Sequence, residues 1–275
     1  MTIAILGCGY VGQAIAQHWQ QQGHSVTVTT TTPARRPELE AIAAQVKLVQ
    51  GHDLDAVTDL IAGQTTLLIS VGAPRRDAYA ETYLQTANTL GQAIENLGDR
   101  APGHIIYTSS YAVYGDQQGA WVTESTPVQP ANEHGEILAA TEKILLNLAT
   151  PSRPICILRL GGICGPNREV VKIFRRAAGK TRPGSGEDFS NWIHLDDIVG
   201  AIAFAQQHRL HGIYNLVHDH PLPQRELLDR TFTKQNLPLV SWDPTQSSLR
   251  PYNARVSNQK LKQAGYQFHF TDIPL

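Results

Sequence analysis

Short runs rich in valine, isoleucine and threonine alternate along the chain with longer amphipathic stretches. Runs of this kind predict buried strands, and the stretches between them predict helices. The predicted strands are Thr2–Leu6, Ser25–Thr30, Val46–Val49, Thr66–Val71, His104–Ser109 and Pro154–Leu160. The predicted helices are Val11–Gln22, Glu38–Ala44, Asp55–Ala62, Ala78–Leu97 and Gly135–Ala149. This alternation indicates an α/β protein with a doubly wound parallel sheet that helices cover on both faces.

The regular alternation ends after Leu160. Segments 161–169 and 179–191 are rich in glycine, proline and polar residues, which predicts loops, before helix and strand patterns resume at 192–207 and 212–217. We expect a sheet domain over 1–163 that also receives about 191–217, and a smaller C-terminal substrate lobe made of 164–190 and 218–275. In such folds, ligands bind at the carboxyl ends of the strands.

Composition narrows the choice of partners. The 275 residues carry a formal net charge of −1 at pH 7 without a basic run, so we expect no nucleic acid partner. No apolar stretch approaches the roughly 18 residues of a membrane span, and no signal-peptide pattern occurs, so we expect no membrane association and a cytoplasmic protein. The three cysteines, Cys8, Cys156 and Cys164, lack metal-ligand spacing, so we expect no metal site. Two of them lie in apolar runs, which favours buried thiols over disulfide partners.

A glycine triplet, Gly7, Gly9 and Gly12, separates the first predicted strand from the first predicted helix. In this context the first glycine allows a tight turn, the second lets a pyrophosphate approach the backbone, and the third lets helix and strand pack closely. The helix N-terminus then faces the phosphate charge. The pattern predicts a Rossmann-type dinucleotide site, and the alternative is a glycine-rich turn without a ligand.

The residues after the second predicted strand indicate which dinucleotide binds. An NAD site places a carboxylate there for the ribose hydroxyls, but this chain has four threonines, Thr29–Thr32, and then Arg35 and Arg36. Hydroxyl and guanidinium groups suit a 2′-phosphate, so we favour NADP(H) over NAD. The alternative is that the two arginines are a solvated loop pair.

Several motifs together resemble the extended short-chain dehydrogenase/reductases, the NAD(P)-dependent epimerase/dehydratase family. They are GCGYVG, GHDLD, YTSSYAVYG, LRLGGICGP, NWIHLDDIVGAI, GIYNLV and the closing VSNQKLKQAGYQF, and they span nearly the whole chain. The combination is most similar to an atypical branch that keeps GxGxxG. From the glycine motif and the resemblance, we expect the coenzyme to contact Gly7, Gly9, Tyr10, Val11, Gly12, Thr30, Arg35, Arg36, Asp53, Leu54, Val71, Gly72 and Ser109.

The resemblance implies hydride transfer assisted by a tyrosine in a YxxxK motif, a serine that orients the reacting oxygen, and an upstream asparagine. Ser110 matches the serine. Aligning the helix that begins near Gly135 puts His134 at the tyrosine and Leu138 at the lysine, and the asparagine position falls near Tyr83. No YxxxK occurs anywhere in the chain. Three of the four catalytic positions therefore depart from the family pattern.

His134 is our candidate for the missing acid/base. A phenol without a neighbouring lysine keeps a pKa near about 10, whereas an imidazole has a reference pKa of about 6.5 and needs no lysine. The alternative is that His134 is an exposed residue at a helix start. Three tyrosines are substitute candidates that are more often packing aromatics: Tyr83, Tyr111 and Tyr114.

The substrate candidates come from the second half of the chain. We predict that Asn191, His194 and Arg168 contact a small-molecule substrate. Asn191 would bind a carbonyl or a diphosphate, as in a nucleotide sugar. The alternative for His194 is that its side chain locks the turn. We interpret the neighbouring Asp196 and Asp197 as structural groups at a helix start. The family often dimerises through two long helices, so a homodimer is a further expectation.

Two functional hypotheses result. The first is an NADP-binding oxidoreductase or epimerase of the extended short-chain type, acting on a nucleotide sugar or similar substrate, with Ser110 orienting the reacting oxygen and His134 moving the proton. The second is a non-catalytic NADP-binding redox sensor or regulatory protein that has lost the tyrosine and lysine. Ser110 and the NWIHLDD segment favour the enzyme, because a sensor has little need of either.

Overall fold

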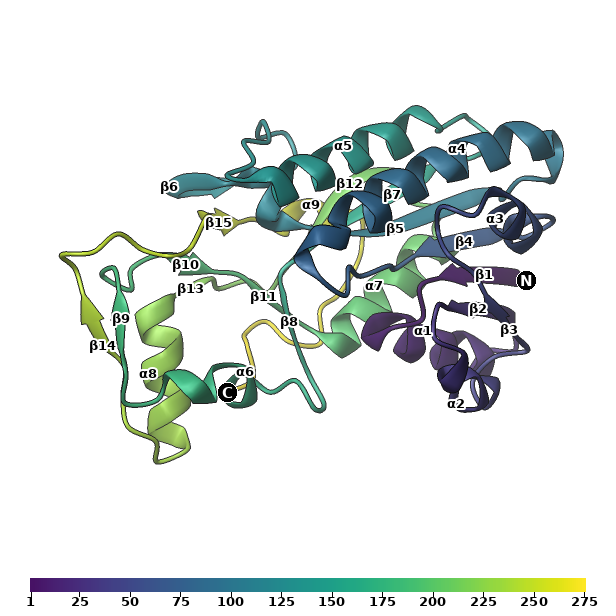
Figure 1. The fold of residues 1–275 in the computed structure, drawn as a ribbon. Helices are drawn as coiled ribbons and strands as arrows, with labels where there is room; N and C mark the ends of the chain where they lie inside the picture. Colours follow the sequence, from purple (N-terminus) through teal and green to yellow (C-terminus); the bar gives the residue numbers. More distant parts are fainter. The chain divides into compact units, whose positions relative to one another are not determined.

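The computed structural model describes residues 1–275, and its largest sheet has seven strands (Figure 1). Its strand order is β12-β7-β5-β4-β1-β2-β3, and the strands from β5 to β3 run parallel to their neighbours. The order reverses between β1 and β4, as expected for a doubly wound sheet. The strands are β1 Thr2–Leu6, β2 Ser25–Thr30, β3 Gln45–Leu48, β4 Thr66–Ile69, β5 His104–Ser110, β7 Ile155–Leu160 and β12 Gly212–Leu216.

Helices cover the sheet on both faces, which confirms the predicted fold class (Figure 1). Alternate strand residues such as Ala4 and Leu6 join a buried cluster with side chains of α3, α4 and α5, while Ile3 and Ile5 are fully buried on the opposite face. Helix α1 lies on that opposite side. The helices of this layer structure are α1 Tyr10–Gln21, α2 Arg36–Glu40, α3 Leu54–Ile61, α4 Thr86–Leu97, α5 Glu133–Asn147 and α7 Leu195–Gln207. None of the helices is long and apolar enough to cross a membrane.

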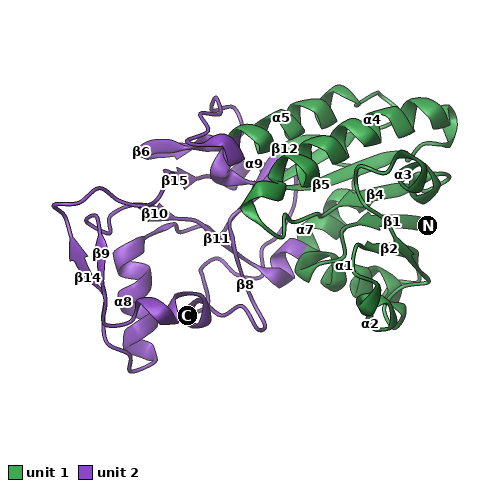
Figure 2. Ribbon diagram, in the orientation of Figure 1, with its two compact units in different colours: residues 1–109, 136–158, 199–213 green, residues 110–135, 159–198, 214–275 purple.

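The chain divides into two compact units (Figure 2). Unit 1 comprises residues 1–109, 136–158 and 199–213, and unit 2 comprises 110–135, 159–198 and 214–275. This division differs from the expected one, because residues 110–135, 159–163, 191–198 and 214–217 belong to unit 2. For the first of these segments the reason is that β6, Asp116–Val122, pairs in parallel with β15, Asn253–Val256, close to the C-terminal end of the sequence.

Unit 2 is built from short strand pairs and short helices rather than from one large sheet. Strand β8 pairs in parallel with β11, β9 with β14, and β10 pairs antiparallel with β13. Helix α8 spans Gln224–Lys234, in a region where the sequence predicted only irregular segments. The remaining bounds are β8 Gly162–Cys164, β9 Thr181–Pro183, β10 Phe189–Ser190, β11 Trp192–His194, β13 Leu222–Pro223, β14 Ser241–Asp243, α6 Val170–Phe174 and α9 Gln259–Gln263.

Asp197 ties the last part of unit 2 to the start of α7. Its side chain is fully buried and accepts hydrogen bonds from the backbone N–H groups of His269 at 2.7 Å and Phe270 at 3.1 Å. The Tyr266 hydroxyl lies 3.3 Å from the same carboxylate and donates to the Asp197 carbonyl at 2.9 Å. These contacts support the structural interpretation of this aspartate.

Replacing Asp197 with alanine should therefore destabilise the protein. The substitution leaves two partly buried backbone N–H groups without their acceptor and an empty space in a buried position, and we expect the free energy of unfolding to fall by about 2 kcal/mol. Urea denaturation followed by circular dichroism measures the change. Asp196→Ala is the control, because that side chain is 62% exposed. Equal losses in both variants would contradict the role given to Asp197.

Candidate functional site

The three glycines of the loop after β1 meet three different steric conditions. Gly7 has φ +95°, and a Cβ there would lie 2.6 Å from the carbonyl oxygen of Ser70. A Cβ on Gly12 would lie 2.4 Å from the carbonyl oxygen of Gly7. A Cβ on Gly9, by contrast, would meet no atom within 4 Å. Gly7 and Gly12 are thus required by the fold, whereas Gly9 leaves open space beside the backbone.

The start of α1 is open to an anion. Gly9 occupies the N-cap position without a capping side chain, and the first turn carries no acidic residue. The loop itself is fixed to β2, because the Gly7 N–H donates to Thr29 Oγ1 at 2.8 Å and the Cys8 N–H donates to the Thr29 carbonyl at 3.1 Å. An uncapped helix N-terminus behind a fixed glycine loop fits a pyrophosphate.

Arg35 lies against this loop. Its Nη1 donates to the Cys8 carbonyl at 2.9 Å, its Nη2 donates to Glu38 at 3.2 Å, and the side chain is 32% exposed. Nearby at the end of β2, the buried Thr30 hydroxyl accepts from the Thr32 N–H at 3.1 Å. A guanidinium is therefore held at the place where the sequence predicted one.

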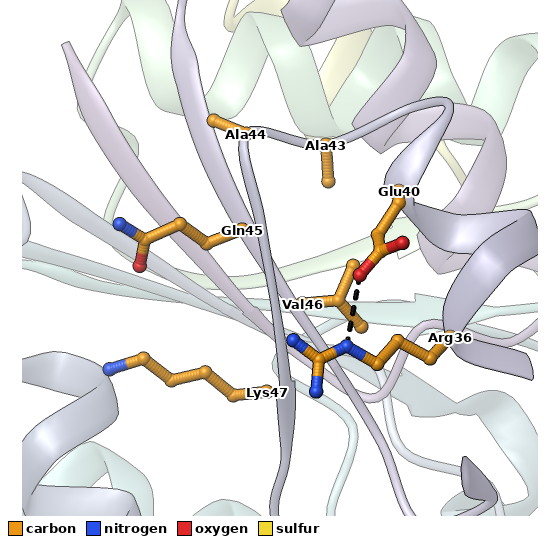
Figure 3. A pocket seen from close by; sticks show the side chains of 7 residues that line it. All are labelled: Arg36, Glu40, Ala43, Ala44, Gln45, Val46 and Lys47. Atoms are coloured by element: carbon orange, nitrogen blue, oxygen red, sulfur yellow. Dashed lines mark hydrogen bonds and ion pairs between the residues drawn. The ribbon is translucent and has the colours of Figure 1, made fainter.

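Arg36 faces elsewhere. It pairs with Glu40 at 2.9 Å and lines a pocket of about 420 Å³ together with Ala43, Ala44 and the β3 residues 45–47 (Figure 3). Consecutive residues of a helical turn point about 100° apart, so Arg35 and Arg36 cannot both face the glycine loop. The structure thus places only the first of the two predicted arginines at the glycine loop. We call this loop, Gly7 to Gly12, together with Arg35, the cradle.

Cys8 contributes a buried thiol to the cradle. Burial raises the pKa of Cys8 to about 12, against the opposing effect of the Arg35 guanidinium. Its carbonyl is the group that holds Arg35. Of the three cysteines in the chain, all are buried and none forms a disulfide, and no group of side chains could hold a metal ion.

The remaining predicted coenzyme residues lie at helix starts and strand ends. Asp53 caps α3 by accepting from the Ala56 N–H at 3.0 Å, and Leu54 begins that helix. Val71 follows β4 and reaches the tight turn, since its Cα lies 2.8 Å from the position of a Gly7 Cβ. Gly72 comes next in the same loop.

Ser109 and Tyr83 make contacts that the sequence did not predict. The Ser109 hydroxyl donates to Glu142 at 2.6 Å in a buried position. Tyr83 belongs to a π-helix, Ala80–Gln85, and its hydroxyl accepts from the Ala73 N–H at 3.4 Å. Burial raises the pKa of Tyr83, so this phenol stays protonated at neutral pH. Its position at the loop after β4 gives it a hydrogen-bonding role rather than that of a base.

The predicted catalytic pair, Ser110 and His134, belongs to unit 2. Ser110 ends β5, and its Oγ accepts from the Ala112 N–H at 3.2 Å. His134 is half-buried in the first turn of α5, directly before Gly135, whose N–H donates to Asn132 at 3.1 Å. Leu138, which the sequence alignment puts at the position of the family lysine, is only 7% exposed. If this alignment holds, an apolar buried side chain stands where the family has a charge.

The side chains of the predicted substrate residues Asn191 and His194 form hydrogen bonds with backbone groups of unit 2. The buried Asn191 amide donates to the Ala254 carbonyl at 2.9 Å and accepts from the Val256 N–H at 2.9 Å. The His194 Nδ1 accepts from the Asp196 N–H at 3.2 Å, which fits the alternative that it locks the turn. Arg168 is exposed in the loop after β8.

Two other arginines, which the sequence did not single out together, form a cationic cluster in unit 2. Arg250 donates through Nη2 to the Tyr111 hydroxyl and the Phe189 carbonyl, both at 3.1 Å, and its buried Nε has no hydrogen-bond partner. Burial and the charge of Arg250 both lower the pKa of Arg182. No carboxylate pairs with either guanidinium. Neighbouring cations without a counter-charge are suited to an anionic ligand.

A Rossmann-type sheet with an open glycine loop and a guanidinium at its second strand defines a dinucleotide-binding protein of the short-chain dehydrogenase type. The model of the NAD dependent epimerase/dehydratase family matches residues 3–216, and the chain belongs to this family. Protein YeeZ of Escherichia coli K12 is 33% identical, over 98% of this chain and 96% of its own length. The UDP-glucose 4-epimerase of Corynebacterium glutamicum is 22% identical, over 97% and 90%.

Solved structures share the fold. A functionally unknown conserved protein from Silicibacter pomeroyi has a TM-score of 0.79 at 26% identity, covering 99% of this chain and 95% of its own. MoeE5 in complex with UDP-glucose and NAD has a TM-score of 0.79 at 17% identity, covering 96% and 91%. Human epimerase family protein SDR39U1 with NADPH has a TM-score of 0.77 at 17% identity, covering 99% and 96%.

Substitutions at Gly9 and Gly12 should have different effects, the first on coenzyme binding and the second on stability. We expect Gly9→Val to keep its melting temperature within a few degrees, because the new side chain enters open space, and to weaken coenzyme binding more than tenfold by blocking a pyrophosphate. Gly12→Ala should instead lose about 2 kcal/mol of stability, because its Cβ clashes with the Gly7 carbonyl. Fluorescence titration with NADPH and thermal melts measure the two effects. Undiminished NADPH binding by Gly9→Val would contradict the cradle.

His218 should make the free energy of unfolding fall as the pH is lowered. Burial lowers the pKa of this imidazole to about 4 from 6.5, and its Nε2 accepts from the His194 N–H at 3.0 Å. Because the folded pKa is depressed, the unfolded chain binds more protons, so stability is full above about pH 6.5 and declines as the pH falls toward 4. The loss attributable to His218 should be about 1.4 kcal/mol at pH 5.5.

Urea denaturation at pH 8 and pH 5.5 tests this dependence. The difference between wild type and His218→Asn should shrink at the lower pH, whereas the difference for Gln207→Ala, an exposed residue without a titratable group, should stay constant. Burial raises the pKa of the neighbouring Asp197, which acts in the opposite direction but is present in every variant. A constant difference for His218→Asn would refute the assignment.

Proposed function

We propose that this protein is an NADP(H)-binding oxidoreductase or epimerase that acts on an anionic small molecule of the nucleotide-sugar type. The observation that carries the proposal is the coenzyme cradle of unit 1. There, the uncapped start of α1 lies behind Gly9, and Arg35 is held on the Cys8 carbonyl. These features support the binding of a pyridine dinucleotide at the glycine loop.

Arg35 supports a preference for the phosphorylated coenzyme. A 2′-phosphate can accept two hydrogen bonds from a guanidinium, and the Arg35 side chain is partly exposed for such a contact. SDR39U1, which shares the fold, has a structure with NADPH, whereas the MoeE5 structure contains NAD. Coenzyme choice within this fold therefore depends on local residues, and here the local cation favours NADP(H).

The cationic cluster of unit 2 supports an anionic substrate. Arg182 and Arg250 lack carboxylate partners, and aromatic rings flank them, with Arg182 over Trp242 at 6.0 Å and Arg250 over Tyr252 at 5.1 Å. Phosphate oxygens fit the guanidinium groups, and a base or sugar fits the ring faces. A relative is named UDP-glucose 4-epimerase, and MoeE5 was solved with UDP-glucose. We assign the anion contact to these two arginines in addition to Arg168.

The coenzyme, when bound, supplies hydride transfer, and the protein supplies orientation and proton transfer. Ser110 orients the reacting oxygen of the substrate through its hydroxyl. His134 gives a proton to that oxygen or takes one from it, in place of the family tyrosine. An imidazole can do this near neutral pH without the lysine that Leu138 replaces.

A non-catalytic sensor is the second candidate, and one observation favours it. The lysine position holds Leu138, which is 7% exposed, so no charge is present there to activate a phenol. A protein that only binds the coenzyme would tolerate this replacement. In this case the cradle of unit 1 would be retained and turnover would be absent.

Turnover distinguishes the two candidates. We expect the protein with NADP(H) to catalyse deuterium incorporation from deuterated water, or a change in coenzyme absorbance, with at least one UDP-sugar. Ser110→Ala and His134→Ala should each lower the rate by about 100-fold, because general acid–base catalysis contributes at least that much. His208→Ala is the matched control. Activity that survives His134→Ala would refute the acid assignment, and NADPH binding without turnover on any UDP-sugar would favour the sensor.

A further inference from the structure

A carboxylate lies at the coenzyme cradle although none follows β2 directly in the sequence. Glu38, in α2, accepts from Arg35 Nη2 at 3.2 Å and from the side-chain amide of Gln13 in the first turn of α1. Its charge also reaches the Cys8 thiol of the glycine loop. The helical geometry of α2 thus brings an acid to the side of the cradle where the adenine ribose would bind.

Arg35 is shared between the loop and this acid. One terminal nitrogen donates to the Cys8 carbonyl at 2.9 Å, and the other pairs with Glu38. The loop contact fixes the guanidinium in place, and the Glu38 contact neutralises it. A ligand that approaches Arg35 therefore meets a cation and an anion side by side.

We propose that the Arg35–Glu38 pair determines coenzyme preference and that it lets the protein accept both NADPH and NADH. This inference rests on the proposed function in one respect, namely that a pyridine dinucleotide binds at the glycine loop. The 2′-phosphate of NADPH competes with Glu38 for Arg35 and is repelled by the carboxylate. The ribose hydroxyls of NADH donate to Glu38 and leave the ion pair intact.

The physical consequence is that the protein prefers NADPH over NADH only moderately. Arg35 attracts the 2′-phosphate, and Glu38 opposes part of that attraction. Both side chains are partly exposed, at 32% and 57%, so salt screens both effects. The difference between the two coenzymes should therefore narrow as the ionic strength rises.

The same helix offers a matched control. Arg36 and Glu40 form an ion pair at 2.9 Å, with exposures of 57% and 54%, and carry the same charges as Arg35 and Glu38. They line the pocket beside β3 and not the glycine loop (Figure 3). A change at Glu40 alters the net charge of the protein by the same amount without touching the cradle.

Fluorescence titrations of wild type, Glu38→Gln, Arg35→Gln and Glu40→Gln with NADPH and NADH at low salt test the inference. Glu38→Gln should raise the ratio of NADPH to NADH affinity about tenfold, because it removes the repulsion of the phosphate. Arg35→Gln should lower that ratio about tenfold or more. Glu40→Gln should leave it within about twofold. Thermal melts verify that each variant is folded.

Three results would overturn the inference. The ratio could stay unchanged in Glu38→Gln, or Glu40→Gln could shift it as far, which would reduce the effect to net charge. Wild-type protein could also reject NADH altogether while binding NADPH. Failure of the wild type to bind either coenzyme is a different result, because it would refute the proposed function as well.

Discussion

The coenzyme cradle depends on one close approach between two backbones. Where β1 ends, the turn at Gly7 passes so near the Ser70 carbonyl that a Cβ would lie 2.6 Å from its oxygen. The parallel register that places Leu6 opposite Ile69 creates this approach. Only glycine tolerates both the contact and the left-handed backbone. The direction of α1, the bonds to Thr29 and the place of Cys8 all follow from this turn.

The fold of unit 1 could be predicted because its signals are local. A strand such as Ser25–Thr30 is a β-branched run between a glycine and a threonine-rich loop, and the structure places β2 at these residues. The short strands of unit 2 have no comparable local pattern in the sequence. Strand β6 acquires its partner β15 from a distant part of the chain, and the alternation of polar and buried residues in β15 covers only four residues, too few to predict a strand or its partner. The expected domain boundary therefore missed residues 110–135.

The candidate site could be predicted where the type and spacing of the residues alone indicate their role. Glycine spacing predicted the loop, and the two arginines after β2 predicted a guanidinium beside it, although the sequence did not show which of Arg35 and Arg36 lies there. Roles that depend on the direction of a side chain were not predictable. Arg36 differs from Arg35 only by one helical step, and Asn191 looks like a substrate contact until both ends of its amide are seen to bind backbone groups. Arg182 and Arg250 become neighbours only through the tertiary fold.

The buried thiol of Cys8 has a consequence for the chemistry around the coenzyme. With its pKa raised to about 12, the thiol is protonated at neutral pH. Oxidants and alkylating reagents attack the thiolate, so burial makes this sulfur less reactive than an exposed cysteine. The glycine loop is therefore a poor target for covalent modification through Cys8, because its one sulfur is both buried and protonated.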